Sequence, residues 1–504
     1  MTSSAKHQSS SRPKLMMVTA VWGDWHTKML LEMNIPTLLA PDNMPALSKQ
    51  VDVTYVIYTR DEDFDRLDKA PIILEMRRYM KVNVTLLKDV DLSNPIAAHH
   101  AAWAKGIDLA RAAGMLALLM PPDVAWSSTS FKTVGQKLAE GHQAILMTYL
   151  RVEDKSFEKN ILALRTAGSH SLTISGNDLV TLCVRSLHPL MAAYLRNSDY
   201  FPIHPEMMFW PVKDEGMVLR VLAREMFLFD PNKAELNAVA LPNRPFKPGE
   251  ACFIDDSDDL FAVSLAPLGT DLAWHVNRRT ADPIDVGGWW LSYDSPVNDF
   301  VVSHKVRWHF APVTEKKWQA AELASDLFIR RAAANREANR LWLGARHHGC
   351  RLAAKLIALS IYTGLAARVA RGRKGNIVLL PSDEALEAEG QEFVDALFDA
   401  KSHAVRSQLF KAHLVPEHDP VEAGVDPLAQ LALSDVNAEI GTVSGQVHTV
   451  DRRDGVLFVS GARVVGEPIS LGPHIVYIVD KVLEPAGSML THTGTLPSGD
   501  SVPA

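Results

Sequence analysis

The sequence HIVYIVDKVLEP, residues 474–485, combines an apolar run of strand length with a charged pair and a closing proline. The apolar anchors of the run are β-branched or aromatic, as is typical of strands: Ile475, Tyr477 and Ile478. Asp480 and Lys481 can remain at the surface or pair locally. The stretch is therefore predicted to form a strand that ends in a charged turn.

Three earlier segments extend this pattern toward the N-terminus: Asn376–Leu386 (NIVLLPSDEAL), His413–Pro416 (HLVP) and Val459–Val465 (VSGARVV). In the first segment, Ser382 follows an apolar strand and can cap a helix that begins at Asp383. The acidic residues at that position complement the positive end of the helix dipole. We therefore expect a strand, a capped helix and a later strand in one domain.

Together the four segments resemble the fasciclin (FAS1) family over residues 350–486. In that family a strand with a helix cap comes first, a histidine-containing segment lies mid-domain, and a strand of the I-x-x-I-D-x-V-L-x-P type closes the fold. The resemblance implies a smaller α+β domain that acts as an adhesion or interaction module for a protein partner. The tyrosine that usually precedes the family's histidine is Ala412 here, and we expect His413 to be a hydrogen-bonded structural residue.

The composition of the whole chain is that of a globular protein. The chain has 504 residues, of which 47% are apolar and 22% charged, and its formal net charge is −7. These values fit about two to four domains and exclude a mainly disordered chain, a collagen-like fibre or a disulfide scaffold. The acidic balance argues against nucleic acid as the main partner, because phosphate binding needs a basic face. The spacing of Cys183, Cys252 and Cys350 indicates neither a disulfide framework nor a metal site.

Neither a secretory signal nor a membrane span is predicted. The polar ends, residues 1–13 and 487–504, are expected to be disordered. The apolar run Leu15–Trp22 is too short for a signal peptide. The run Leu352–Ala370 is interrupted by charged residues such as Lys355, whereas a span needs about twenty apolar residues. We therefore expect a cytoplasmic protein.

Residues 14–312 alternate strand and helix patterns and are predicted to form one α/β domain. Apolar or β-branched runs of strand length occur at Leu15–Val21, Val51–Tyr58, Val82–Leu87, Met115–Met120 and Ala144–Leu150. An alanine-rich helix is expected over residues 96–113. Strands joined by helices indicate a mostly parallel sheet covered on both faces. Residues 313–349 are charged and alanine-rich, and are predicted to form a helical connector.

Three segments of this domain resemble the GT-A fold of glycosyltransferases: Lys14–Trp25 (KLMMVTAVWGDW), His99–Met120 and Met120–Ser130 (MPPDVAWSSTS). The resemblance implies a nucleotide-sugar donor at the carboxyl edge of the sheet, where open α/β folds bind ligands. It also implies an acceptor that is a glycan or a protein. The residues assigned to the donor are Trp22, Gly23, Asp24, Asp123 and Trp126.

The same resemblance raises the question of a divalent cation, Mn²⁺ or Mg²⁺. Such an ion, held by an Asp-x-Asp motif, stabilises the diphosphate that leaves. Here Asp123 is the one metal ligand that the motif retains, because Pro121 takes the first aspartate position. One carboxylate makes a poor site for either ion. The enzyme is then metal-independent, or other ligands come from elsewhere in the chain, or catalysis has been lost.

The acceptor side is expected within residues 199–310, which are rich in proline and tryptophan. His204 and Glu206 are the predicted catalytic pair, because alternate residues of an extended segment share a face and the two could deprotonate a sugar hydroxyl. A turn organised by the nearby prolines is the alternative. Trp210 is assigned to stacking on the acceptor sugar, although it could equally fill the core. His99 and His100 are further candidate bases or acceptor-binding groups.

Asp255 and Asp256, also assigned to the acceptor, belong to an acidic run that extends to Asp259. Four carboxylates in five residues repel one another. A solvated loop, a helix N-terminus and a site for a cation or sugar hydroxyls all fit this run.

Two functions follow from these patterns. The first is a glycosyltransferase with a FAS1 interaction module. The second is a non-catalytic carbohydrate-binding or scaffold protein, which Pro121 favours. The chain contains no Walker lysine loop, no G-x-G-x-x-G after a strand, no H-E-x-x-H and no G-x-S-x-G, so the chemistries those motifs serve are not indicated.

Overall fold

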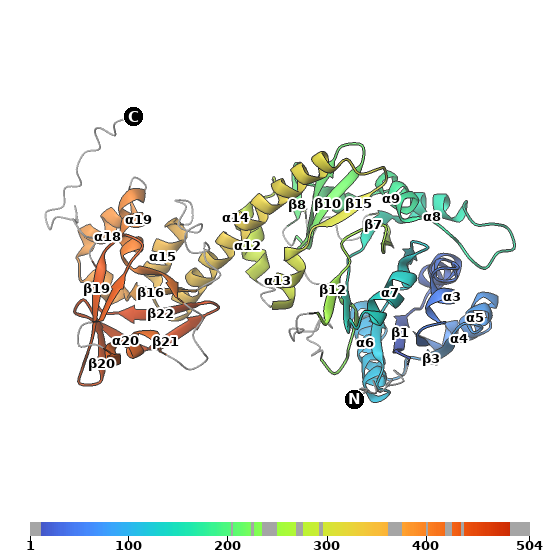
Figure 1. Ribbon diagram of the computed structural model, residues 1–504, viewed down its shortest axis with the longest axis horizontal. Coiled ribbons are helices and arrows are strands. Elements are labelled where there is room, and N and C mark those ends of the chain that lie inside the picture. The colour runs from blue at the N-terminus through green and yellow to red at the C-terminus, as the bar shows by residue number, and fades with distance from the viewer. Residues whose placement is uncertain are drawn as a thin grey trace, which may run out of the picture. The chain divides into compact units, whose positions relative to one another are not determined.

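The computed structural model describes residues 12–202, 205–222, 226–233, 249–268, 276–291, 296–360, 375–399, 402–418, 426–434 and 438–483. The chain divides into two compact units. Unit 1 comprises residues 1–281 and 293–326, and unit 2 comprises residues 282–292 and 327–504. Figure 1 labels their helices and strands in chain order.

The main sheet of unit 1 has the order β12-β6-β11-β4-β1-β2-β3 within the described ranges. Neighbouring strands among β3, β2, β1 and β4 are parallel, β11 is antiparallel to both β4 and β6, and β12 is parallel to β6. The strands are β1 (Lys14–Ala20), β2 (Asp52–Thr59), β3 (Lys81–Leu86), β4 (Leu116–Leu119), β6 (Ala144–Leu146), β11 (Met226–Phe229) and β12 (Ala251–Phe253). The chain therefore builds the sheet outward from β1 in both directions.

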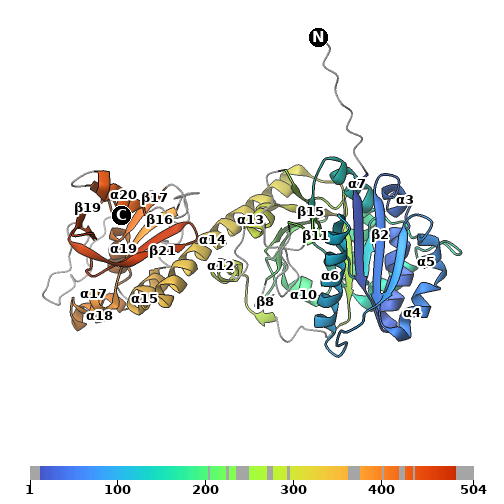
Figure 2. The same cartoon turned by 90° about the horizontal axis from the view of Figure 1, so that it is seen from below.

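Alternation of side chains in β1 separates two apolar cores. Met16 and Val18 belong to one core, whereas Leu15 and Met17 belong to the other, because successive side chains of a strand point to opposite faces. Figure 2 shows α6 on one face of the sheet and α3, α4 and α5 on the other. Both faces are thus covered, as the strand patterns predict.

The helices of unit 1 mostly follow the strands in alternation. Their bounds are α1 (Asp24–Met29), the π-helix η1 (Leu30–Asn34), α2 (Ile35–Leu38), α3 (Met44–Leu47), α4 (Asp61–Asp68), α5 (Pro71–Met76), α6 (Pro95–Ala112), α7 (Ser130–Ala139), α8 (Asp154–Leu162), α9 (Gly176–Arg185), α10 (Pro189–Ala193) and α13 (Pro296–Ser303). Helix α6 packs so closely on β1 that a Cβ atom at Gly106 would lie 2.5 Å from a methyl group of Val18.

Residues 199–310, whose sequence is irregular, contribute most strands of three small sheets. The described strands form the orders β15-β10-β9, β5-β13-β7 and β14-β8. Their bounds are β5 (Val124–Trp126), β7 (Leu150–Glu153), β8 (Tyr200–Pro202), β9 (Met207–Val212), β10 (Gly216–Val221), β13 (Ala262–Ala266), β14 (Val276–Arg278) and β15 (Val306–His309).

The charged segment predicted to be a connector is one helix, α14 (Glu315–His347). The division between the two units falls within it, after Asp326. Its second half packs against α12 (Pro283–Leu291), where the Arg336 guanidinium lies 4.4 Å from the ring centre of Trp290. This part of α14 is therefore built into unit 2.

Unit 2 contains a sheet of order β17-β16-β22-β21-β20-β19-β18 in its described residues. The segment HIVYIV is β22, which pairs in parallel with β16, and Ser382 caps α17 by accepting a 3.1 Å hydrogen bond from Ala385 N. Both predictions are confirmed. The elements are α15 (Arg351–Ser360), β16 (Gly375–Pro381), α17 (Asp383–Glu387), α18 (Gln391–Phe398), α19 (His403–Ala412), β17 (Leu414–His418), α20 (Pro427–Ser434), β18 (Ala438–Gly441), β19 (Val447–Arg453), β20 (Val456–Val459), β21 (Ala462–Leu471) and β22 (His474–Val479).

Two further features bear on the setting of the protein. Across the described residues, no helix is both long enough and apolar enough to span a bilayer. Cys183, Cys252 and Cys350 are free thiols.

Candidate functional site

The carboxyl ends of β1 and β4 mark the point where the order of the main sheet reverses. In open α/β sheets this crevice is the usual ligand site. The loop after β1 is held by Gly23, whose φ of 79° suits glycine and whose N–H donates a 2.8 Å hydrogen bond to Asp63 Oδ2. Arg60 Nε donates to the same carboxylate oxygen at 2.6 Å. The loop expected near the donor is therefore fixed to the first turn of α4, which follows β2.

Asp123 follows β4 and is half-buried at this edge. Its Oδ2 accepts a 2.9 Å hydrogen bond from the Ser264 hydroxyl of β13. Burial raises the pKa of Asp123, and the hydrogen bond from Ser264 and the nearby His26 oppose that rise. Asp123 is therefore a carboxyl group that is costly to ionise.

One histidine, His26, lies near this carboxyl group, and His99 lies near His26. Burial lowers the pKa of His26, although Asp123 opposes the effect. Burial, followed by the proximity of His100 and His26, lowers the pKa of His99 to about 4. His26 is nevertheless an exposed residue. Both shifts favour the uncharged form of the imidazoles of His26 and His99.

Aromatic rings lie beside these imidazoles. The Trp25 ring is 4.7 Å from that of His26, and the Trp103 ring is 4.3 Å from that of His99, both edge-on. Trp22 is half-buried and packs on the core. The indole N–H of Trp103 is buried with no hydrogen-bond partner among the described residues. The edge thus combines aromatic surface with groups that can take up protons.

Two other residues assigned to the donor lie in contrasting places. Asp24 is almost wholly exposed and forms a 2.9 Å ion pair with Arg66. Trp126 has no exposed surface, because it packs in the core with ring centres of Phe131 and Phe227 at 5.1 and 5.3 Å. Trp126 therefore offers no face on which a donor could stack in this conformation.

The residues around Asp123 do not fit a Mn²⁺ or Mg²⁺ site. Both ions prefer several oxygen ligands, and carboxylates above all. In the described part of the chain, Asp123 belongs to no group of three converging histidine, cysteine or acidic side chains. No step of the chemistry is therefore derived through an ion at this edge.

The structure also describes a pocket of about 450 Å³ at the opposite edge of the same sheet. Arg12, Lys14 and Lys81 line it, at the amino ends of β1 and β3. Its position does not correspond to the expected donor site.

In the described residues, the side chains assigned to catalysis and to acceptor binding do not form one site. His204 lies outside the described residues. The side chain of Glu206 is exposed, and its backbone carbonyl accepts a 2.7 Å hydrogen bond from Leu222 N. Trp210 is 5% exposed on β9, so it contributes mainly to packing.

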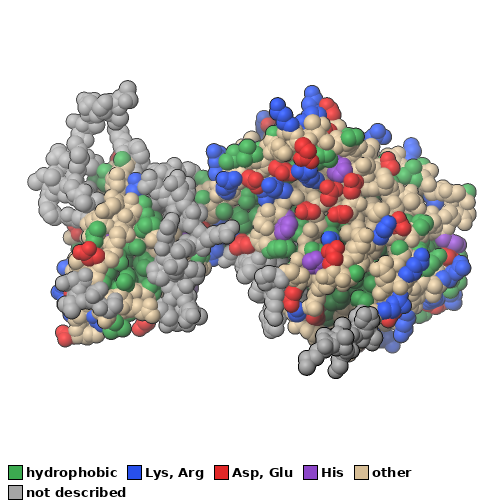
Figure 3. All heavy atoms as spheres, viewed as in Figure 1, with side chains coloured by type: hydrophobic (Ala, Val, Ile, Leu, Met, Phe, Trp, Pro, Cys, Tyr) green, Lys and Arg blue, Asp and Glu red, His purple; other side chains and the backbone are tan. Residues whose placement is uncertain are grey.

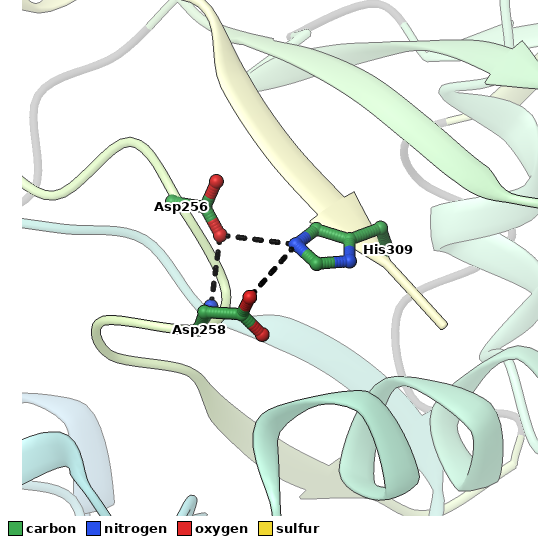
Figure 4. A group of neighbouring side chains, drawn as sticks. All are labelled: Asp256, Asp258 and His309. Atoms are coloured by element: carbon green, nitrogen blue, oxygen red, sulfur yellow. Dashed lines mark hydrogen bonds and ion pairs between the residues drawn. The ribbon is translucent and has the colours of Figure 1, made fainter. Parts of the chain in front are cut away.

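The acidic run lies beside a histidine that sequence reasoning missed. His309 Nε2 is 3.1 Å from Asp256 Oδ1 and 3.5 Å from Asp258 Oδ2. Figure 4 shows the three side chains facing one another. His309 is the last residue of β15, and Asp255 contacts the same strand through a 2.8 Å hydrogen bond from Arg307 N to its carbonyl. Figure 3 shows acidic and histidine side chains gathered on the face of unit 1 in that view.

Neither grouping could be read from local sequence. His309 is separated from the acidic run by about fifty residues, and a single histidine in an apolar strand carries no signal of its own. His26 directly follows the segment Lys14–Trp25, which contains the expected donor loop, and this position was the one feature of the sequence that could have indicated its place near Asp123.

Comparison with known proteins identifies the C-terminal part. The fasciclin domain family matches residues 353–485, so this part of the chain is a fasciclin domain, as predicted. A similar solved structure is a FAS1 domain pair from the insect cell adhesion molecule fasciclin I, at 20% identity and a TM-score of 0.22. The match covers 27% of this chain and 46% of that one, less than half of its length.

No curated protein matches the chain. The fasciclin match lies entirely outside residues 14–312, and the GT-A-like fold of those residues stays a prediction.

Proposed function

We propose that unit 1 binds a nucleotide-diphosphate sugar at the carboxyl ends of β1 and β4 and transfers the sugar to a glycan or protein acceptor. The fasciclin domain would serve as the module that engages a protein partner. The observation that carries the proposal is the strand order β11-β4-β1-β2-β3, with its reversal at β1 and Asp123 at that edge. A cytoplasmic setting belongs to the proposal, and the free thiols of Cys183, Cys252 and Cys350 are consistent with it.

The chain's own groups suggest how a leaving diphosphate would be stabilised. A phosphate anion near His26 and His99 would raise their pKa values, which burial holds low in the free protein. Proton uptake would then place positive charge beside the anion. Asp123 opposes a phosphate when ionised, and its raised pKa reduces that repulsion because the carboxyl group can hold a proton.

This mechanism couples donor binding to pH. Protons that bind only to the complex make affinity rise as pH falls. We expect the affinity for a nucleoside diphosphate to increase several-fold from pH 7.5 to 6. Isothermal titration in buffers of different ionisation enthalpy would measure the accompanying proton uptake directly.

The test is a calorimetric panel of uridine, guanosine and cytidine diphosphates and their sugars, with the full-length chain. His26→Gln should weaken binding and flatten its pH dependence, whereas His170→Gln, at an exposed position in unit 1, should change neither. Absence of binding by every member of the panel would refute the proposed donor site. So would binding that both variants leave unchanged.

A second function, a non-catalytic carbohydrate-binding or scaffold protein, is favoured by two observations. Pro121 replaces the first metal carboxylate, and Asp123 has no second carboxylate in a three-ligand group within the described residues. Donor hydrolysis and sugar transfer, measured by release of nucleoside diphosphate, separate the two functions. Tight nucleotide binding without any release would favour the scaffold.

A further inference from the structure

Three potential ligand atoms from two distant segments converge beside β15. His309 Nε2 lies 3.1 Å from Asp256 Oδ1 and 3.5 Å from Asp258 Oδ2, and one ligand atom of each residue lies within 4.8 Å of the others. Metal–ligand bonds of about 2.0–2.2 Å place adjacent ligand atoms roughly 3–3.5 Å apart in tetrahedral or octahedral geometry. The two histidine–carboxylate distances fall in that interval.

We propose that Asp256, Asp258 and His309 bind a divalent transition-metal ion, Zn²⁺ or Mn²⁺. The side chains lie on the loop after β12 and at the end of β15, so this site does not include Asp123. The inference does not rest on the proposed nucleotide-sugar function. Of the three interpretations of the acidic run, the proposal favours a cation site. His309, which lies outside the run, supplies the third ligand.

His309 distinguishes the cluster that it forms with Asp256 and Asp258 from a solvated acidic loop. Its side chain is 7% exposed, yet its Nε2 points toward both carboxylates. A neutral imidazole carries at most one proton on Nε2, so one N–H cannot satisfy two carboxylates fully. One metal ion, by contrast, accepts the imidazole lone pair and an oxygen from each aspartate together.

The carboxylates are also without a lysine or arginine ion-pair partner. Within the described ranges, no ion pair joins a Lys or Arg side chain to Asp255, Asp256, Asp258 or Asp259. The nearby Arg307 is already engaged by Glu322 and Glu315 at 2.7 and 3.3 Å. The concentrated negative charge is therefore available to a bound cation.

The backbone holds the loop in place against β15. Ser257 N donates to the Arg307 carbonyl at 3.0 Å, and His309 N donates to the Ser257 hydroxyl oxygen at 3.2 Å. A Cβ atom at Gly176 would lie 2.4 Å from the Ser257 carbonyl oxygen, so the start of α9 packs tightly against the loop. The aspartates are thus positioned before any ion binds.

Asn177 of α9 orients one of the ligands. With its amide nitrogen turned toward the loop, it donates to Asp258 Oδ1 at 3.2 Å and to the His309 carbonyl at 3.0 Å. Asp258 Oδ2 is then directed at His309. Loss of a hydrogen bond that orients a metal ligand in this way commonly lowers metal affinity by about 10–100-fold.

The donor set selects the kind of ion. Magnesium and calcium prefer oxygen ligands alone, whereas zinc binds imidazole and carboxylates together; manganese favours oxygen ligands, and here the two carboxylates supply them. The Asp258 side chain is 61% exposed, so the remaining coordination positions face solvent. Such an open site can bind a water molecule or an anionic oxygen of a ligand.

The experiment titrates Zn²⁺ and Mn²⁺ separately into metal-stripped, tag-free, full-length protein by calorimetry. Co²⁺ absorption in the visible range reports the ligand set directly. We expect one ion per chain, with affinity reduced at least about tenfold in Asp258→Asn, whose side chain is largely exposed. His309→Gln should abolish the Co²⁺ bands that depend on imidazole.

Matched controls remove equivalent groups that are not ligands. Asp255→Asn removes a charge from the same loop, and His170→Gln removes an exposed histidine. Both should bind metal within about threefold of wild type. Circular dichroism confirms that each variant is folded, and Asp258→Asn keeps the test decisive if His309→Gln does not fold.

Several results would overturn the proposal. These are no binding of either ion, unchanged affinity in Asp258→Asn, or an equal loss in Asp255→Asn, which would indicate diffuse charge attraction. Binding of Mg²⁺ as tightly as Zn²⁺ would overturn the role of the imidazole as a ligand.

Discussion

Replacement of Glu337 by glutamine should destabilise unit 2 strongly. Glu337 lies in the second half of α14 and is 6% exposed. It accepts hydrogen bonds of 2.9 Å from Arg336 Nε and from Arg340 Nε, and its Oε2 lies 3.2 Å from His474 Nε2. His474 Nδ1 in turn accepts from Asn376 N, which assigns the proton to Nε2. One carboxylate therefore joins α14 to the start of β22.

The size of the effect follows from the charge on Glu337. Burial by itself would raise its pKa, but the hydrogen bonds from His474 and Arg340 and the arginine charges lower the pKa from 4.5 to about 2. At about 1.4 kcal/mol per unit of pKa shift, the lowering of the Glu337 pKa corresponds to about 3 kcal/mol of folding stability. Removal of one partner from a buried ion pair costs a similar amount, about 3–5 kcal/mol.

The lowered pKa of Glu337 also determines how the stability of unit 2 depends on pH. Because the folded pKa is depressed, the stabilisation is fully present above pH 4.5 and is lost as pH falls toward 2. The difference between wild type and Glu337→Gln should therefore be largest near neutral pH and smaller at pH 3.5.

Hydrogen exchange followed by mass spectrometry can measure the effect in the full chain. Peptides from β16 and β22 report the opening free energy of unit 2 separately from unit 1. Glu389→Gln, at an exposed position of unit 2, is the matched control. A change below about 1 kcal/mol, or an equal change in the control, would refute the inferred role of Glu337.

Two further predictions concern the same unit. A Cβ atom at Gly375 would lie 1.5 Å from the Pro473 carbonyl oxygen, so Gly375→Ala should lower the free energy of unfolding by about 1–3 kcal/mol. Gly441→Ala meets no atom within 4 Å and should be neutral or slightly stabilising in the same urea titration. Burial, above all, lowers the pKa of His413 to about 4, and its Nε2 accepts a 3.0 Å hydrogen bond from Leu483 N. Stability of unit 2 should therefore decline as pH falls from about 6.5 to 5, because only the unfolded chain takes up the proton, and a flat profile would contradict this.

The strand and cap predictions succeeded where the signal is local. The run at β1 is apolar, those at β2 and β22 are rich in β-branched or aromatic residues, and each forms a largely buried strand. Ser382 accepts the backbone hydrogen bond that its position before two acidic residues predicts. Likewise, His413 donates from Nδ1 to the Leu409 carbonyl and is structural, as expected. Each of these outcomes depends on residues within a few positions of one another.

The expected sites depended on contacts that local patterns do not specify. Trp126 follows an apolar strand near the donor edge in the sequence, yet it is buried between Phe131 and Phe227. The pattern marks it as large and apolar but does not specify which face of β5 it occupies. Asp123 finds its partner Ser264 only because β13 pairs with β5.

By itself, the sequence determined the alternation of strands and helices, the capped helix α17 and a fasciclin domain, expected at residues 350–486 and matched by the family at residues 353–485. Periodicity, capping and a specific closing strand suffice for these, because each is a property of neighbouring residues. The tertiary structure alone decided that His309 meets Asp256 and Asp258, and that His26 lies near both Asp123 and His99. Those groups are joined by pairing between strands far apart in the chain, whose partners and register depend on the packing of the whole core.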